Sequence, residues 1–352
     1  MHKFIKDIMD DNKAIPDLYN QSPLIQYLDS KMGAINGDSK TRRSLGNIYA
    51  IYSILNFYTK DWHSKKNEYK KFKGYDYTKL FEFYRSLYGG DKLQNHALNS
   101  RVNGEFANKF NLLGKELIII NEGRYALHID MLYVGDEDIS KIIQTIIEKY
   151  IALLKAKDSS LVAKLKLLLE EKDAKVKKEK INELLEEKAE ARIFEIISYA
   201  ILKSYYKTKF VYFGYELEDV KKEFLELYKT GRTNANDGGI DFVMRPVGRL
   251  FQVTEVDTYD KYLLDMDKVV HFPITFVIKT EKLKVDVSRE ISDYIEQKSG
   301  GMIILKDKYN KCIEEIITIN ELIAYLNLLD TDSVNQVLID IDIYYRMELN
   351  IS

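Results

Sequence analysis

Two short runs decide the fold of this chain: Asp237-Gly238-Gly239-Ile240-Asp241-Phe242-Val243-Met244, and then Leu250-Phe251-Gln252-Val253-Thr254-Glu255-Val256. Both runs are rich in strand-forming residues. Between them, Arg245-Pro246-Val247-Gly248-Arg249 predicts a type I turn, with Pro at the second position and Gly at the fourth. We therefore expect a β-hairpin. A carboxylate in a buried strand is costly unless it is paired or binds a metal, so Asp241 indicates a divalent cation.

The helix expected upstream also carries an acid in an apolar setting. Residues 193–202 are apolar on nearly every side and are interrupted only by Glu195 and Ser198. A helix that is hydrophobic all round is a buried helix. Glu195 is therefore either a core acid satisfied by a neighbouring group or a member of an active site, and we take the second reading forward as a hypothesis.

This order of elements resembles a known family. A helix with Glu195, a strand that begins at Asp241, and a partner strand with Gln252 and Thr254 look like type II restriction endonucleases of the PD-(D/E)xK nuclease superfamily. The resemblance covers residues 190–310. It implies an α/β fold, α+β over the whole chain, with a mixed sheet flanked by helices. It also implies metal-dependent, site-specific cleavage of double-stranded DNA.

One position departs from the family pattern, which has an acid or Gln followed two residues later by Lys. Here Thr254 stands where Lys is expected. Strand alternation places Gln252 and Thr254 on one face, toward a cleft, and Glu255 on the other, unless a bulge brings it into the site. A second register, with Glu255 and Asp257, stays open. Lys261 is a candidate for the missing ammonium group; the alternative is an ordinary surface lysine.

The resemblance implies a role for each of these residues in a Mg²⁺ site. Asp241 would be the principal metal ligand, and Glu195 a second ligand or the holder of a metal-bound water. Gln252 would offer its carbonyl to the metal or its amide to the phosphate, and Thr254 or Glu255 would orient the attacking water. Mg²⁺ commonly takes one or two protein carboxylates together with waters and substrate oxygens.

Composition limits the other functional classes. The 352 residues include 53 Lys and Arg against 55 Asp and Glu, a formal charge of −2, so any positive potential for DNA must be local. The single cysteine, Cys312, excludes a disulfide framework and fits a reducing compartment. No uncharged run approaches the length of a membrane span, so we expect a cytoplasmic protein with no membrane partner.

Residues 1–135 predict a separate helical, winged-helix-like domain that reads DNA. Helical spacing recurs over 45–55, 79–88 and 95–110, and a hairpin is expected over 116–129. In a winged helix the third helix enters the major groove. Its polar residues would contact base edges, the alternative being the polar face of a surface helix: Asn95, His96, Asn99, Ser100, Arg101 and Asn103.

The rest of the chain divides into a helical linker or arm, 136–190, and a nuclease domain, 191–352. Within the arm, Asp158-Ser159-Ser160 predicts a break with an N-cap. Further strands are expected at 210–213, 274–278 and 302–305, and helices at 260–271 and at 319–329, the latter capped by Asn320. The polar loop before Asp241 would contact DNA near the scissile phosphate through Arg232, Asn234 and Asn236.

The sequence therefore predicts a Mg²⁺-dependent restriction endonuclease. A homodimer suits a symmetric DNA site, and a restriction role implies a cognate DNA methyltransferase. Two alternatives remain: a non-enzymatic winged-helix regulator, and a non-specific or repair nuclease of the same fold.

Overall fold

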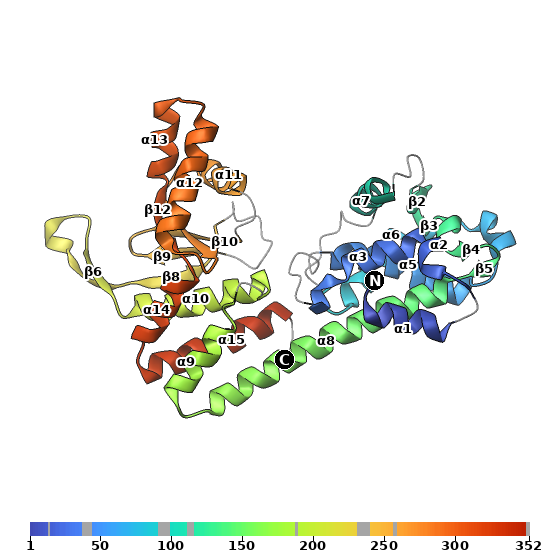
Figure 1. Ribbon diagram of the computed structural model, residues 1–352, viewed down its shortest axis with the longest axis horizontal. Helices are drawn as coiled ribbons and strands as arrows, with labels where there is room; N and C mark the ends of the chain where they lie inside the picture. The colour runs from blue at the N-terminus through green and yellow to red at the C-terminus, as the bar shows by residue number, and fades with distance from the viewer. Residues whose placement is uncertain are drawn as a thin grey trace. The chain divides into compact units, whose positions relative to one another are not determined.

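The chain forms two compact units, Met1–Ser160 and Leu161–Ser352, in a computed structural model (Figure 1). Both helices and sheets are present, which confirms the mixed α+β class. Helix α8 (Ser140–Glu170) crosses the boundary between the units. The structure describes residues 1–12, 15–36, 44–90, 99–110, 116–186, 189–230, 240–255 and 259–349.

The N-terminal unit is built around helix α5 (Leu45–Asp61), most of whose residues are buried. Short helices precede it: α1 (Lys3–Asp11), α2 (Leu18–Gln21), α3 (Pro23–Lys31) and the 3-10 helix η1 (Gly33–Asn36). After it come η2 (Lys66–Lys71), β1 (Tyr75–Asp76), α6 (Tyr77–Ser86), α7 (Ser100–Phe110), β2 (Ile118–Asn121) and β3 (Arg124–Leu127). The unit ends with η4 (Ile129–Met131), β4 (Tyr133–Val134), β5 (Glu137–Asp138) and the first part of α8.

The hairpin expected over 116–129 is confirmed as β2 and β3, which pair antiparallel. Its two turn residues, Glu122 and Gly123, have φ of 50° and 78°. Positive φ at both central positions matches the right-handed twist of the flanking strands. β3 also pairs with β1, so the small sheet has the order β1-β3-β2.

The C-terminal unit contains a five-stranded mixed sheet in the order β12-β11-β10-β9-β8. β8 (Glu226–Lys229) and β10 (Arg249–Glu255) each pair antiparallel with β9 (Phe242–Arg245). β11 (Ile274–Lys279) and β12 (Ile313–Ile317) run parallel to β10. The helices of this unit are α9 (Ala174–Glu183), α10 (Ala191–Lys207), α11 (Asp260–Lys268), α12 (Lys284–Ser299), α13 (Ile303–Lys311), α14 (Ile319–Leu328) and α15 (Thr331–Leu349). A separate hairpin consists of β6 (Phe210–Phe213), η5 (Leu217–Asp219) and β7 (Lys221–Phe224).

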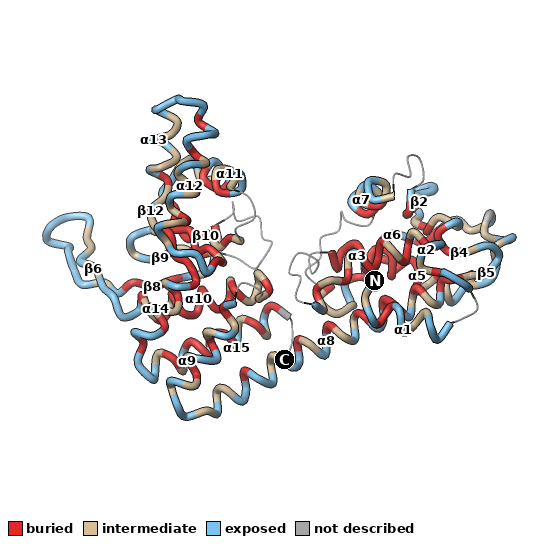
Figure 2. Tube along the Cα trace, in the orientation of Figure 1, coloured by how far each residue is buried: buried red, intermediate tan, exposed pale blue. Residues whose placement is uncertain are grey.

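Each face of the five-stranded sheet packs on its own hydrophobic cluster. Phe251 and Val277 face α10, α14 and α15. Leu250 and Phe276 face α11 and α12. Figure 2 shows the buried residues concentrated in α10 and the sheet between these helices. Strand alternation places neighbouring residues on opposite faces, and this decides which side chains can meet.

One expectation about strands is corrected. Residues 302–305 form the beginning of α13 instead of a strand, and Ile303 and Ile304 are 73% and 86% exposed. The strand in this region is β12, in which Glu314 and Glu315 follow Ile313. A short apolar run cannot be assigned to strand or helix by periodicity alone. The hairpin of β9 and β10 is confirmed; its Arg245–Pro246 bond is cis, and the Gly248 amide donates to the Met244 carbonyl at 2.8 Å.

Two expectations about helix ends are also wrong. α8 continues through 158–160, and Asp158 is buried and accepts a hydrogen bond from the Tyr88 hydroxyl at 2.6 Å instead of capping a new helix. The N-cap of α14 is Thr318 in a capping box with Glu321. Asn320 instead donates to the Glu281 carbonyl at 2.8 Å.

Candidate active site

Four strand ends meet at one edge of the five-stranded sheet. β10 and β11 end there, at Glu255 and Lys279, which are paired in register. β8 ends there at Lys229, opposite the beginning of β9 at Phe242. The carboxyl ends of parallel strands are where open α/β sheets bind ligands. This edge therefore carries the sequence-predicted site residues of the C-terminal unit that the structure describes.

Asp241 is held at this edge by three backbone contacts. Its amide donates to the Phe251 carbonyl at 3.0 Å, and its carbonyl accepts from the Thr230 amide at 3.0 Å. Its carboxylate Oδ2 accepts from the Val253 amide at 2.7 Å. The side chain thus continues the ladder between β9 and β10 and is fixed beside the segment that carries Gln252 and Thr254.

Gln252 and Thr254 lie on the face of β10 that looks toward α11, because Phe251 and Val253, which alternate with them, face α10. Both are buried, with 6% and 3% exposure. The Gln252 carbonyl oxygen Oε1 has no hydrogen-bond partner among the described residues. A buried acceptor left unpaired costs about 1–3 kcal/mol. A cation or a donor from a ligand would remove that cost.

Lys261, the candidate for the missing ammonium group, contacts Thr254. It lies in the first turn of α11, and its Nζ donates to the Thr254 hydroxyl at 3.1 Å. The ammonium group therefore stands on the same face as Gln252 and Thr254. Lys261 is exposed, as the surface-lysine alternative expects, so both readings of this residue stay open.

Glu195 belongs to α10, and Glu255 lies on the face of the sheet that α10 covers, opposite Gln252 and Thr254. Glu195 Oε1 pairs with Lys229 Nζ at 2.7 Å, and Glu255 Oε1 with Lys279 Nζ at 2.8 Å. The sheet thus separates Glu195 from Gln252 and Thr254, although all lie near the same edge. The sequence analysis did not single out Lys229 or Lys279. The feature that could have found them is their position, since each is the last residue of its strand.

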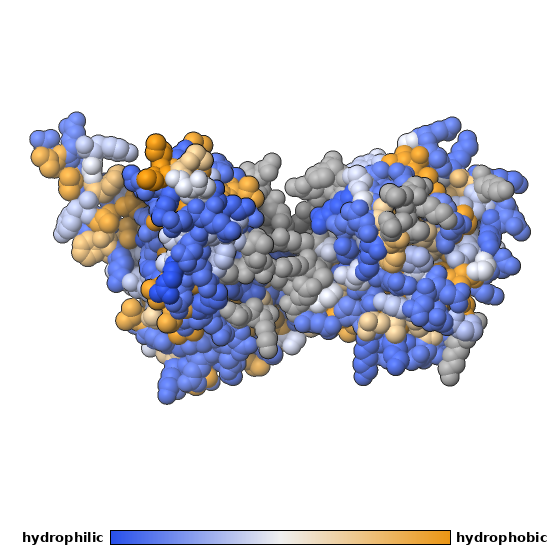
Figure 3. Space-filling model, turned by 45° about the horizontal axis from the view of Figure 1, so that its top comes forward, coloured by the Kyte–Doolittle hydropathy of each residue, from blue (hydrophilic) through white to orange (hydrophobic). Residues whose placement is uncertain are grey.

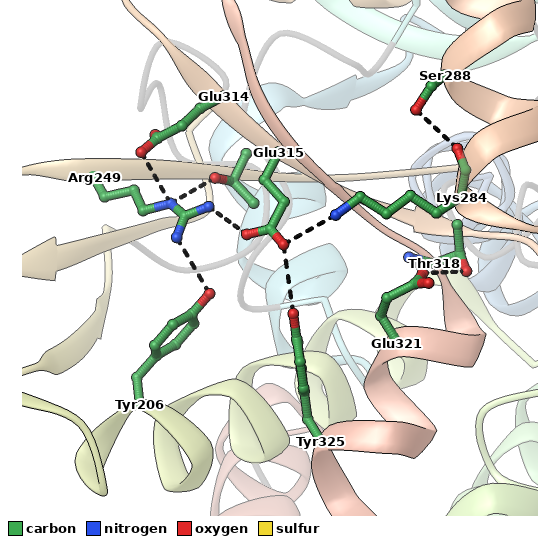
Figure 4. Close-up of polar contacts among 10 residues, drawn as sticks. Tyr206, Arg249, Lys284, Ser288, Glu314, Glu315, Thr318, Glu321 and Tyr325 are labelled. Atoms are coloured by element: carbon green, nitrogen blue, oxygen red, sulfur yellow. Dashed lines mark hydrogen bonds and ion pairs between the residues drawn. The ribbon is translucent and has the colours of Figure 1, made fainter.

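The opposite end of β10 is fixed by a polar network (Figure 4). Arg249 donates to Glu315 on β12 at 2.5 Å and to the Thr275 hydroxyl on β11 at 2.8 Å. Lys284 on α12 lies 3.2 Å from the other Glu315 oxygen. Burial opposes ionisation, but these donors hold the pKa of Glu315 below its ordinary value. The network ties three strands together and so positions β10.

In the N-terminal unit, the residues expected to contact DNA differ in their exposure and in their hydrogen bonds within the protein. Asn103 exchanges two hydrogen bonds of 2.9 Å with the backbone of Ile118, so its amide holds α7 on β2 and is removed from the base-reading set. Arg101 is 55% exposed and pairs with Glu105 at 3.0 Å. Ser100 is exposed and Asn99 half-buried. The remaining predictions fall outside the described residues: Asn95, His96, Arg232, Asn234 and Asn236.

The donor set at the edge fits a hard cation only in part. Across the described residues, no group of three or more His, Cys, Asp or Glu side chains is arranged to hold a metal ion. One carboxylate and one amide oxygen, from Asp241 and Gln252, nevertheless match the few protein ligands that Mg²⁺ commonly takes. The unpartnered Gln252 Oε1 supports this assignment.

Comparisons of the chain with family models, curated proteins and solved structures found no match. None of the described helices has both the length and the apolar character required to cross a membrane.

Proposed function

We propose that this chain is a Mg²⁺-dependent, site-specific endonuclease that cleaves double-stranded DNA. The observation that carries the proposal is the arrangement at the sheet edge: Asp241 fixed on the Val253 amide, Gln252 with a buried carbonyl oxygen that lacks a partner, and Lys261 on Thr254. This is the order of elements and the set of groups that the resemblance to PD-(D/E)xK nucleases requires, with the lysine supplied by a helix.

Asp241 and Gln252 would hold the metal. When bound, Mg²⁺ would neutralise charge on the scissile phosphate and favour ionisation of a water molecule. Lys261 would place a positive charge beside the attacking water and the phosphate, and Thr254 would orient the lysine. The pairs Glu195–Lys229 and Glu255–Lys279 would position the strand ends on the other face.

The N-terminal unit supports a DNA-reading role. Its elements follow the order α5, β1, α6, α7, β2, β3, and its sheet has the order β1-β3-β2. Three helices followed by a hairpin is the order of a winged helix, in which α7 would be the recognition helix. Val102 and Phe106 bury one side of α7, and Ser100 and Arg101 lie on its solvent side.

The partners follow from this activity. A second copy of the chain would allow both strands of a symmetric site to be cut. A methyltransferase of the same specificity would protect the DNA of the cell that makes the enzyme, and both proteins would act in the cytoplasm.

The decisive experiment compares the native chain with Asp241→Asn. Asparagine keeps an oxygen that can accept from the Val253 amide, so the variant should fold, but it removes the charge that binds the cation. We expect cleavage of phage DNA in Mg²⁺ to fall by more than about 1,000-fold, while DNA binding in Ca²⁺ is retained. Asp293→Asn, at an exposed position of α12, is the matched control and should cleave normally.

The band pattern separates the alternatives. Discrete fragments support a site-specific enzyme, and a smear supports a non-specific or repair nuclease of the same fold. DNA binding without any metal-dependent nicking supports the non-enzymatic winged-helix regulator. One observation favours this alternative: the N-terminal unit has its own hydrophobic core. Near-normal cleavage by Asp241→Asn would refute the metal site.

A further inference from the structure

The hairpin of β6 and β7, here called the ribbon (residues 210–224), has little of the molecule packed against it. Within the described residues its strands pair only with each other. A two-stranded hairpin is at best marginally stable in water unless something packs on it. Figure 1 shows the ribbon projecting from the C-terminal unit, away from the five-stranded sheet.

The ribbon exposes large apolar side chains. Tyr212, Tyr215 and Leu217 are 72%, 93% and 91% exposed, and Phe210 and Phe224 are 46% and 53% exposed. The four aromatic residues alone present on the order of 500 Å², since each can bury about 150–250 Å². Monomeric proteins rarely expose contiguous apolar patches larger than a few hundred Å². In Figure 3 hydrophobic residues gather on this projection.

The ribbon has four acidic residues against Lys221 and Lys222, a formal charge of −2, and this charge disfavours nucleic acid as its occupant. Its tip, residues 214–219, contains Glu216, Glu218 and Asp219 and no basic residue, so its formal charge is −3. An acidic surface repels phosphate backbones. An apolar and basic protein surface is the complement.

The tip of α12 and α13 in the same unit has that complementary character. Met302, Ile303 and Ile304 are 61%, 73% and 86% exposed. Residues 298–311 contain four lysines against Asp307, a formal charge of +3. Lys298 pairs with Asp260 at 3.0 Å and Lys306 with Glu296 at 3.1 Å, so Lys308 and Lys311 supply the basic character of the tip. Figure 1 shows this tip and the ribbon leaving the sheet in different directions, so they do not cover each other.

We propose that the ribbon of one copy docks on the α12–α13 tip of a second copy, and that the contact is repeated by two-fold symmetry. A two-fold interface of this kind is closed, because each copy offers both surfaces. Two such contacts would bury roughly 2,000 Å² in total, the size of a stable interface. The inference rests on the homodimer of the proposed function and names its surface.

Sedimentation velocity of the full chain, without DNA or metal, tests the interface. The native chain should be a dimer at micromolar concentration. Leu217→Ser in the ribbon and Ile304→Ser in the tip should each weaken dimerisation at least tenfold. Leu167→Ser, at a 68% exposed position of α8, is the matched control and should leave the dimer unchanged.

A charge exchange tests the pairing itself. Glu218→Lys and Lys308→Glu should each weaken the dimer, and the double variant should recover it, because opposite charges then face each other again. A monomeric native chain, or a dimer insensitive to the ribbon and tip variants, overturns the proposal. So does an open polymer, which would exclude two-fold closure. Since no cleavage is measured, failure of this test is distinct from failure of the nuclease assignment.

Discussion

Gly104 offers a test of whether α7 faces DNA. It lies within the helix, and a Cβ built on it meets nothing within 4 Å. Glycine in a helix interior costs about 1 kcal/mol relative to alanine. Because alanine fits here without a clash, Gly104→Ala should stabilise the N-terminal unit by about 1 kcal/mol, which raises its melting temperature by roughly 2–4 °C for a unit of this size.

The same substitution should weaken DNA binding. Gly104 is exposed on the solvent side of α7, together with Ser100, Arg101 and Asn108. If this side enters a groove, a residue without a side chain lets the backbone approach the bases closely. A methyl group there should reduce affinity about tenfold, or about 1.4 kcal/mol.

Thermal unfolding and fluorescence anisotropy with duplex DNA at fixed salt measure the two effects. Thr145→Ala, at an exposed position of α8 in the same unit, is the control and should change stability slightly and binding not at all. Stabilisation of Gly104→Ala with unchanged affinity would show that α7 does not face DNA. Destabilisation would refute the argument from free space around Gly104.

Two further predictions concern the C-terminal unit. Lys261→Ala should slow single-turnover cleavage roughly 10²–10⁴-fold without loss of DNA affinity. Adding Thr254→Lys to that variant should restore much of the cleavage rate. No recovery would argue against a catalytic role for a lysine beside position 254. Glu315→Gln should lower the free energy of unfolding by about 2 kcal/mol at neutral pH, because Arg249 and Lys284 lose a partly buried charged partner. Because the folded state lowers the pKa of Glu315 from its ordinary value of 4.5, its stabilising contribution is complete above about pH 4.5 and is lost as the pH falls through the folded pKa. The free energy of unfolding, measured as the pH is lowered, should therefore depend less on pH in the variant.

The local pattern of residues was sufficient to predict many of the helices and strands. Alternation and turn residues predicted the hairpins of β2 with β3 and of β9 with β10, and a continuous apolar run predicted β11. These patterns work because each element's own periodicity reports which side is buried. The apolar run at 302–305 was wrongly predicted to be a strand, since four apolar residues fit a strand or a helix until the packing is known.

Only the tertiary structure decided which polar groups meet. Glu195 and Asp241 are both acids in apolar surroundings, and the sequence could not reveal that the sheet lies between Glu195 and Gln252, or that Lys229 neutralises Glu195. Lys261 is close to Thr254 because α11 packs on the face of the sheet where Thr254 lies. Contacts across a sheet depend on register and face, which are set by the burial of distant residues together.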